Sequence, residues 1–338
     1  MKNIVITGDS LSYNRYGYDD EPRTNAYDCH IGMDSWSFRI RKEFISSAPG
    51  FLYANAISFD GEFVCGMGEG IDDINGLFGE KVVTIKPQNG KINFEAESDT
   101  GEIVIYFQKR PDNYCRFNIY ADGVLAKEAV DTYGGIEQFQ GYGLKPVKIP
   151  CSKEKRKHKI ILSDFETTEK EPYVTIAGIS PELREVYTTG QGSRTAKFLL
   201  YHFNERIAKY SPDTLILIFG GNDVLFYSEE EYKKHLSEIF QRMAEEFPLC
   251  RIITLTIPES AKIKDEIRGM KISTDEDYNF LIDKYNRVLE ELSEKNNALC
   301  IKQKEVFKGI SPDVWRYDNV HLSNAGNDIL YEKIREIL

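Results

Sequence analysis

Residues 2–12, KNIVITGDSLS, open the chain with an apolar run that ends in Gly-Asp-Ser-Leu. A short run of β-branched residues bounded by a glycine is typical of a buried strand. Ser10 is therefore expected directly after a strand, either as a nucleophile at the strand end or as a polar residue that begins a surface loop. Because Gly-Asp-Ser is also common in turns, residues elsewhere in the chain must decide between these two interpretations.

Strand and helix patterns alternate in the first segment and in the last third of the chain, but not in the region between them. The spacing of Trp36, Ile40 and Phe44 predicts a helix over residues 35–46, and FLYANAI (51–57) predicts the next strand. The last third continues as helix 195–210, strand 214–223, helix 229–247, strand 250–258, helix 275–296, strand 298–303 and helix 323–338. This alternation predicts an α/β domain in which helices cover both faces of a parallel sheet.

The middle of the chain carries short strand patterns separated by turn signals, and no helical pattern between residues 79 and 180. Several short strands at near-regular spacing predict an antiparallel sandwich. We therefore expect a discontinuous α/β domain over residues 1–75 and 180–338, interrupted by an inserted all-β module over residues 76–179.

The composition narrows the class of protein. Lys and Arg number 43 against 54 Asp and Glu, which gives a net charge of −11 and argues against a nucleic-acid groove. The basic run KEKRKHK (153–159) is expected to be a solvated turn. The sequence has no apolar run long enough for a membrane span or a signal-peptide core, so we expect a cytoplasmic protein without a membrane partner. Six widely separated cysteines favour free thiols over a disulfide or zinc framework.

A serine nucleophile needs a general base and an acid that orients it. Of the five histidines, His202 and His235 lie in helical runs and His158 lies in the charged turn, while His30, in a loop-like stretch, stays an alternative near the site mouth. The fifth histidine, His321, follows Asp318 by three residues in RYDNVHLSNAGN, just before a predicted helix. A turn with this spacing can direct a carboxylate and an imidazole the same way, although a polar loop ahead of a capped helix reads equally well.

An acyl-transfer site also needs donors for the developing oxyanion. Asn222, in FGGNDV, follows a buried strand and should emerge at the carboxyl edge of the sheet, where ligands bind in open α/β folds. Gly190 or Gly192, in TTGQGSRTA, could expose a backbone N–H ahead of a helix. The alternatives are an ordinary turn asparagine and a glycine-rich helix entry, while the spacing of a phosphate-binding loop is absent.

Four blocks together, Gly-Asp-Ser-Leu, a Gly-rich turn, Gly-Gly-Asn-Asp and Asp-x-x-His, resemble the SGNH hydrolase superfamily, also called the GDSL esterases and lipases. The resemblance covers residues 1–75 and 180–338 and implies a three-layer α/β/α, flavodoxin-like fold without a metal or cofactor. It implies Ser10 as nucleophile, His321 as base and Asp318 as the orienting acid. The N–H groups of Ser10 and of the glycine, with the Asn222 amide, would hold the oxyanion. Asp9 belongs to the motif and is expected to be structural.

Block two differs from the family pattern in two respects. In the family it follows the second strand closely, whereas here the β module intervenes. The family pattern Gly-x-[ST]-[ST]-Arg, placed with its arginine at Arg194, favours Gly190 as the oxyanion glycine. The distance back along the helix from Pro212 favours a position nearer Gly192. A less favoured third choice is Gly61 in NAISFDGE, whose following residues do not predict a helix.

The inserted module resembles the small jelly-roll attached to SGNH domains in some carbohydrate esterases; an insert that only shapes the cleft or makes a dimer contact fits equally. The resulting hypothesis is a serine esterase that removes a small acyl group, most simply acetyl, from a carbohydrate or another small ester. Tyr13, Tyr16 and Tyr18 could stack on sugar rings. A lysophospholipase or thioesterase with the same triad, and an inactive carbohydrate-binding protein, are the competing hypotheses. The sequence leaves open whether the chain forms a homo-oligomer.

Overall fold

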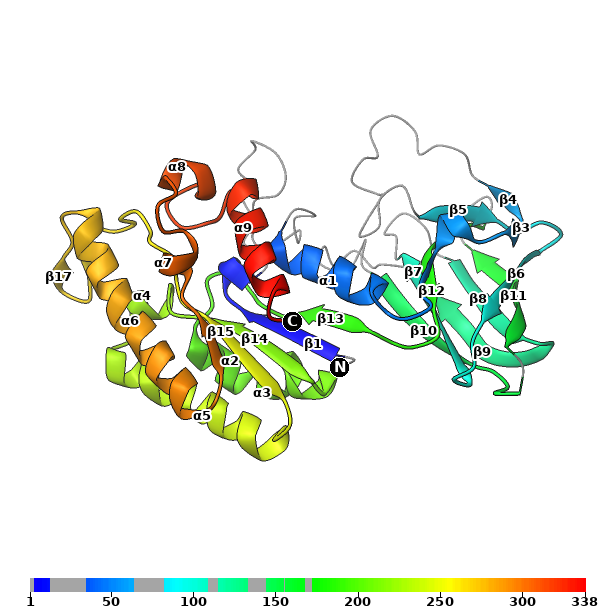
Figure 1. Cartoon of the computed structure of the whole chain (residues 1–338), viewed down its shortest axis with the longest axis horizontal. Helices are drawn as coiled ribbons and strands as arrows, with labels where there is room; N and C mark the ends of the chain where they lie inside the picture. Colours follow the sequence, from blue (N-terminus) through cyan, green and yellow to red (C-terminus); the bar gives the residue numbers. More distant parts are fainter. Residues whose placement is uncertain are drawn as a thin grey trace. The chain divides into compact units, whose positions relative to one another are not determined.

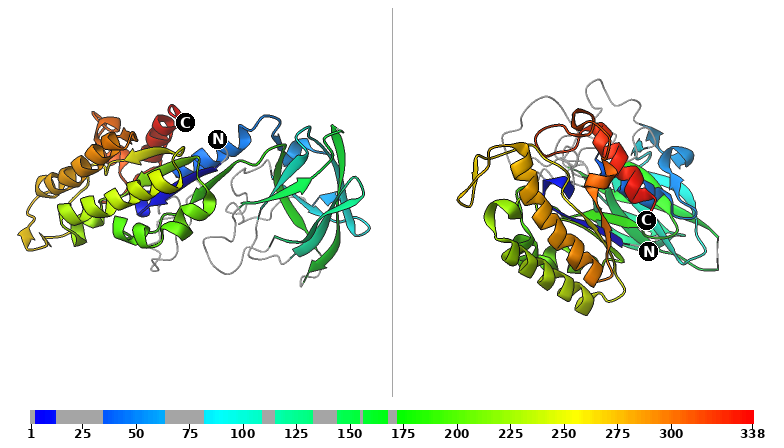
Figure 2. Two further views of the ribbon diagram at one scale, coloured as in Figure 1. Left: turned by 90° about the horizontal axis from the view of Figure 1, so that it is seen from below. Right: turned by 60° about the vertical axis from the view of Figure 1, so that its left-hand side comes forward.

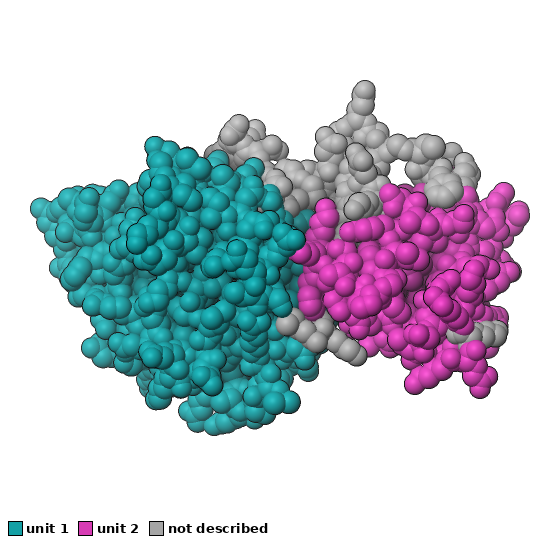
Figure 3. Space-filling model, in the orientation of Figure 1, with its two compact units in different colours: residues 1–41, 185–338 teal, residues 42–184 magenta. Residues whose placement is uncertain are grey.

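The structure is a computed structural model, which describes residues 3–12, 35–63, 82–108, 115–132, 144–154, 156–167 and 172–338. The chain divides into two compact units, distinguished by colour in Figure 3. Unit 1 comprises Met1–Arg41 and Glu185–Leu338, and unit 2 comprises Lys42–Arg184.

Unit 1 is built on a five-stranded parallel sheet with the strand order β13-β1-β14-β15-β18. The strands are β1 (Asn3–Gly8), β13 (Glu185–Thr188), β14 (Thr214–Ile218), β15 (Arg251–Leu255) and β18 (Leu299–Ile301). All residues of β14 and all but the first of β1 are buried, because helices cover both faces of the sheet. In chain order the strands are arranged 2-1-3-4-5, which is the flavodoxin-like order.

The helices of unit 1 lie on both faces of this sheet. They are α1 (Trp36–Ser46, which continues into unit 2), α2 (Ala196–Tyr201), α3 (Phe203–Arg206), α4 (Asp223–Phe226), α5 (Glu229–Glu246), α6 (Asp275–Lys295), α7 (Gln303–Val306), α8 (Pro312–Trp315) and α9 (Asn324–Arg335), with the 3-10 turns η1 (Ser10–Ser12) and η4 (Ala208–Tyr210). Figures 1 and 2 show α5 on one face and α9 on the other. The predicted three-layer α/β/α architecture is confirmed. A small hairpin, β16 (Glu266–Ile267) and β17 (Met270–Lys271), precedes α6.

Unit 2 contains two antiparallel sheets. One has the order β10-β7-β12-β5-β4, with β2 also paired to β12, and the other has the order β3-β6-β11-β8-β9. The strands are β2 (Leu52–Tyr53), β3 (Phe59–Asp60), β4 (Glu62–Phe63), β5 (Val83–Lys86), β6 (Lys91–Glu97), β7 (Glu102–Gln108), β8 (Cys115–Ala121), β9 (Val124–Asp131), β10 (Leu144–Pro150), β11 (Lys157–Thr167) and β12 (Val174–Ser180), with the 3-10 turn η2 (Ala54–Ala56). Residues of both sheets form one hydrophobic cluster, among them Ile105 and Phe107 from the first sheet and Phe117 and Ile160 from the second. The basic run at residues 153–159 is a solvated turn only in its first part, because residues 157–159 belong to β11 and His158 is buried, so the expectation of a turn over the whole run is wrong.

The prediction that FLYANAI, residues 51–57, forms the next strand of the parallel sheet is wrong. Leu52 and Tyr53 form β2, which pairs antiparallel with β12 of unit 2, and Ala54–Ala56 form η2. A short apolar run fits either kind of sheet, so only the available pairing partner decides its place. The second strand of the parallel sheet is β13, which begins at Glu185.

The insertion therefore has different boundaries from those expected at residues 75/76 and 179/180. The chain leaves unit 1 within α1 and returns at β13, so the boundaries lie at Arg41/Lys42 and Arg184/Glu185. The glycine-rich turn at residues 189–193 then follows the second strand of the parallel sheet directly. The β module therefore does not separate that strand from block two, contrary to the expectation from the sequence.

No helix in the part of the chain that the structure describes is long and apolar enough to span a bilayer. The four cysteines among these residues, Cys115, Cys151, Cys250 and Cys300, are free thiols.

Gly8 ends β1 opposite Ile218 of β14, which gives a direct test of the fold. Its φ is +157°, and an added Cβ would lie 2.2 Å from the carbonyl oxygen of Ile218. We expect Gly8→Ala to lower the free energy of unfolding by about 3 kcal/mol, because backbone atoms cannot yield to the methyl group. Urea unfolding measures this loss.

Gly269→Ala is the matched control for this experiment. Gly269 has a φ of +80° with no atom within 4 Å of an added Cβ, so it isolates the cost of an unfavourable φ. That cost is about 1 kcal/mol. Equal losses in the two variants would contradict a steric role for Gly8.

Candidate active site

Ser10 lies at the carboxyl end of β1, where the chain turns sharply into η1. The N–H of Asp9 approaches the carbonyl oxygen of Ile218 at 3.4 Å, and both the N–H and the hydroxyl of Ser12 donate to the carbonyl oxygen of Asp9. The indole N–H of the fully buried Trp36 donates to the carbonyl oxygen of Leu11 at 3.0 Å. These bonds hold the turn, so Ser10 is presented from a fixed backbone.

Three side chains from distant parts of the sequence form a hydrogen-bonded series. The hydroxyl of Ser10 lies 2.8 Å from Nε2 of His321, and Nδ1 of His321 lies 2.8 Å from Oδ2 of Asp318. A carboxylate can only accept, so Nδ1 carries the proton and Nε2 of the neutral ring accepts from the serine. The arrangement can activate a hydroxyl by general-base catalysis.

Asp318 is held as a carboxylate by its own turn. Its Oδ1 accepts the backbone N–H groups of Val320 and His321, each at 2.7 Å. Partial burial raises the pKa of Asp318, but the hydrogen bonds and charge of His321 and the two backbone donors outweigh burial and lower it from 3.8 to about 2. Asp318 therefore remains ionised at neutral pH and can stabilise an imidazolium.

Asp318 and His321 lie in a hairpin-like loop, which we call the triad loop (Trp315–Ser323). The N–H of Tyr317 donates to the carbonyl oxygen of His321, and the N–H of Ser323 donates to that of Trp315. The ring of Trp315 stacks on Phe307, with centroids 4.4 Å apart. Ser323 also caps α9 by accepting from the N–H of Gly326.

Asn222 and Gly190 also lie beside the Ser10 segment. Asn222 follows β14 and its Nδ2 donates to Oδ2 of Asp9 at 3.2 Å. Gly190 packs so tightly against this segment that an added Cβ would lie 1.8 Å from the hydroxyl oxygen of Ser12 and 3.1 Å from the carbonyl oxygen of Gly8. Gly192 follows two residues later in the same turn.

Two buried carboxyl groups support this edge of the sheet. Asp9 and Asp223 are 1% and 0% exposed. Burial raises the pKa of Asp9 to about 6, although bonds from Leu11 and Asn222 and the charge of His321 lower it. Burial also raises the pKa of Asp223 to about 8, and the nearby charge of Asp9 raises it further. Asp223 accepts the N–H of Ala196 at the start of α2.

The structure thus brings together Ser10, Asp318 and His321, with Asn222 and Gly190 beside the same turn. His158 lies in unit 2, where it bonds to Asp122 at 2.8 Å, and His202 bonds to Glu205 on the surface. His30, Tyr13, Tyr16 and Tyr18 lie outside the described residues. Gly61 lies between β3 and β4 of unit 2. The hydrogen bond from Asn222 to Asp9 was not predicted. The sequence indicated a role for Asp9 only through its place in the Gly-Asp-Ser motif.

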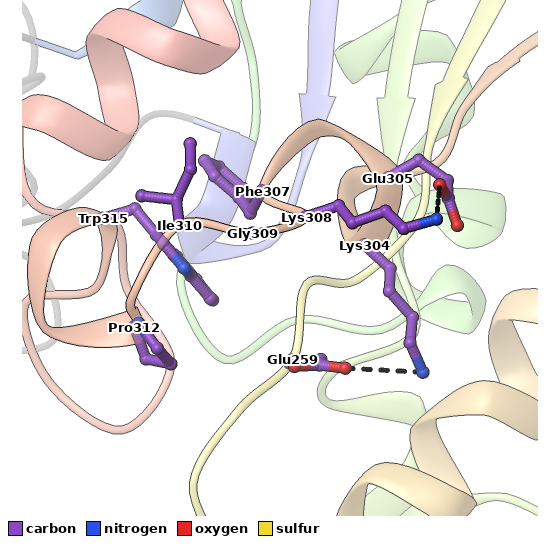
Figure 4. Close-up of a pocket in the computed structure, with 9 residues that line it drawn as sticks. All are labelled: Glu259, Lys304, Glu305, Phe307, Lys308, Gly309, Ile310, Pro312 and Trp315. Carbon is purple, nitrogen blue, oxygen red and sulfur yellow. Dashed lines mark hydrogen bonds and ion pairs between the residues drawn. The ribbon is translucent and has the colours of Figure 1, made fainter.

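A cavity of about 370 Å³ lies behind the triad loop, between α7, α8 and Glu259. Figure 4 shows its two lysines already paired, Lys304 with Glu259 and Lys308 with Glu305, beside an apolar wall that includes Trp315. Ser10, Asp318 and His321 do not line it. Among the described residues, no group of three or more His, Cys, Asp or Glu side chains is arranged to hold a metal ion.

Comparison with known proteins gives a family match over part of the chain. Residues 171–329 match the family described as GDSL-like Lipase/Acylhydrolase. This match includes Asn222, Asp318 and His321, and Ser10 precedes it. Among curated proteins, none matches the chain.

Several solved structures are similar to this chain. One is a peptidoglycan O-acetylesterase, with 14% identity and a TM-score of 0.45, over 100% of this chain and 91% of the other. Another is an acetylxylan esterase from Geobacillus stearothermophilus, with 24% identity and a TM-score of 0.37, over 46% and 73% of the two chains. A lipase/acylhydrolase from Enterococcus faecalis has 20% identity and a TM-score of 0.37, over 46% and 76%.

The raised pKa of Asp223 predicts a pH dependence of stability. Its pKa is 3.8 ordinarily and about 8 in the fold, so between pH 4 and pH 8 the folded state retains a proton that the unfolded state has released. Rising pH therefore favours unfolding through this group. We expect the free energy of unfolding of Asp223→Asn, minus that of the wild type, to rise by about 1 kcal/mol or more from pH 4 to pH 8 in urea titrations.

Asp277 provides a control of opposite sign. Backbone donors from Ser273 and Thr274 lower its pKa, so its contribution to stability is present above its ordinary pKa and is lost as the pH falls through the lowered value. The free energy of unfolding of Asp277→Asn, minus that of the wild type, should therefore become less negative as the pH falls. A pH-independent difference for Asp223→Asn would show that this carboxyl is not held protonated.

Proposed function

We propose that the protein is a serine esterase with Ser10 as its nucleophile, in keeping with the match of residues 171–329 to the GDSL-like lipase/acylhydrolase family. The observation that carries the proposal is the unbroken series from the Ser10 hydroxyl through His321 to Asp318, with 2.8 Å at each step. A serine hydroxyl is a weak nucleophile at neutral pH, and a hydrogen-bonded imidazole oriented by a carboxylate is the arrangement that activates it.

In the first half-reaction, the Ser10 oxygen attacks the ester carbonyl while Nε2 of His321 takes the hydroxyl proton. The resulting imidazolium keeps its Nδ1–H bond to the ionised Asp318. His321 then gives the proton to the oxygen of the departing alcohol, and an acyl-Ser10 ester remains. In the second half-reaction, water adds to this ester with His321 again as base, which releases the carboxylic acid and restores Ser10.

The oxyanion of each tetrahedral intermediate needs donors that are already in place. We assign the backbone N–H groups of Ser10 and Gly190 and the Nδ2 group of Asn222 to this role. Gly190 is chosen over Gly192 because Gly190 packs directly against Gly8 and Ser12. One Nδ2 hydrogen of Asn222 is engaged by Asp9, which leaves the second hydrogen for substrate.

The substrate proposed is an acetylated carbohydrate or oligosaccharide. This choice rests on the likeness of the inserted β module to the small modules of some carbohydrate esterases. In support, unit 2 has two antiparallel sheets around a common core.

The nucleophile is tested with a serine-directed phosphonate. Wild-type protein should form one covalent adduct, located at Ser10 by peptide mass spectrometry, and Ser10→Ala should lose the adduct and lower kcat on 4-nitrophenyl acetate by about 10³-fold or more. Ser12→Ala, which changes a nearby buried serine, should still form the adduct at Ser10. Activity retained in Ser10→Ala would refute the assignment, and an unlabelled wild type would favour an inactive binding protein.

The acyl group is tested with 4-nitrophenyl esters from acetate to octanoate. We expect kcat/KM to be highest for acetate and to fall by about tenfold or more at octanoate. The reason is that a site shaped for an acetyl group binds a substrate less well when the acyl chain carries methylenes that do not fit it. Acetate release from acetylated xylo-oligosaccharides should follow the same Ser10 dependence. A preference for octanoate would overturn the deacetylase proposal in favour of a lysophospholipase or thioesterase with the same triad.

A further inference from the structure

The chain segment that follows β15, Thr256–Lys262, is held by two asparagine side chains of α6; we call it the anchored segment. Near its start, the Asn286 side chain of α6 pairs with both backbone groups of Ile257, at 2.8 and 2.9 Å. Two helical turns earlier, Asn279 pairs in the same way with Ser260, with both bonds at 2.9 Å. Each amide donates and accepts at one residue, as a neighbouring strand would, so these bonds fix the segment's direction as well as its distance from α6.

The anchored segment contacts the triad loop one residue beyond the Asn279 clamp. The N–H of Ala261 donates to the carbonyl oxygen of Asn319 at 2.8 Å. Asn319 lies between Asp318 and Val320, at the tip of the triad loop. The bonds within this loop, from Tyr317 to His321 and from Ser323 to Trp315, fix its shape but do not fix the position of its tip. The bond from Ala261 is an external connection at that tip.

We propose that Asn279 is a positioning residue for the Asp318–His321 pair, acting through Ser260, Ala261 and Asn319. This inference rests on the proposed esterase function. The Asn279 clamp adjoins Ala261 on one side, and on the other side the N–H of Lys262 makes a single bond to Asp275 at 2.8 Å, whereas the Asn286 clamp lies at the other end of the segment. The ion pair of Glu259 with Lys304, visible in Figure 4, joins half-exposed side chains at 3.4 Å, and such pairs contribute little.

Loss of the clamp should affect the reaction more than the binding of substrate. His321 must lie within hydrogen-bond reach of both Ser10 and the leaving oxygen, and a displacement of about 1 Å far from the chemistry can lower a rate by about 10²-fold. The remaining bonds of the segment limit this displacement, so we expect a smaller loss of about tenfold in kcat, with KM changed by less than about twofold.

The test compares Asn279→Leu and Asn279→Asp with the wild type on 4-nitrophenyl acetate. Leucine removes both bonds to Ser260, whereas aspartate can still accept the Ser260 N–H but cannot donate to its carbonyl oxygen. We expect a larger loss of kcat in Asn279→Leu than in Asn279→Asp. The far-downfield proton NMR signal of the His321 Nδ1–H bond to Asp318 should shift or broaden in the same order.

Thr274→Ala is the matched control, because Thr274 caps the same helix and its hydroxyl accepts from the N–H of Asp277 within that helix. It should lower the midpoint of thermal unfolding without changing kcat or the downfield signal. The proposal is overturned if Asn279→Leu keeps the kcat and signal of the wild type, or if Thr274→Ala reproduces its losses. Failure of the esterase proposal itself is distinguishable, since wild-type protein would then form no phosphonate adduct at Ser10.

Discussion

The parallel pairing of β1 with β14 is the interaction on which the rest of the site depends. Gly8 lies opposite Ile218 in this pairing, so the residues that follow each strand leave the sheet at the same edge. In the 2-1-3-4-5 order, β1 and β14 are the neighbours from which successive connections run in opposite directions, and their carboxyl ends border the crevice where ligands bind. Asp9 and Asn222 meet there because the backbones approach closely, and Gly8 permits that approach.

The same arrangement explains why the chain can accommodate a long insertion. The chain leaves unit 1 within α1, forms unit 2 and returns at β13, an edge strand of the parallel sheet. Unit 2 therefore interrupts no pairing among the central strands. It buries its apolar residues in its own cluster between two antiparallel sheets. The α/β unit therefore retains a continuous core, and the glycine-rich turn still follows its second strand.

The site combines groups that are fixed by local bonds with groups that depend on distant supports. Asp318 and His321 form their own turn, with three hydrogen bonds that join Asp318 to Val320 and His321, so their mutual geometry is local. Their position relative to Ser10 is not local, because it depends on α9, the stacked Trp315 and the anchored segment. Buried acids add a further cost, since Asp9 and Asp223 are placed where burial opposes their charge.

The sequence by itself determined the alternation of strands and helices, the all-β character of the middle region and the candidate residues Ser10, Asn222, Asp318 and His321. Apolar periodicity and turn chemistry are local properties, and residues that follow parallel strands must share one edge. Only the tertiary structure decided that residues 51–57 belong to unit 2, that β13 is the second parallel strand, and that Asn279 supports the triad loop. These features depend on which partner a short segment meets in space, and hydrogen bonds between residues far apart leave no periodic trace in the sequence.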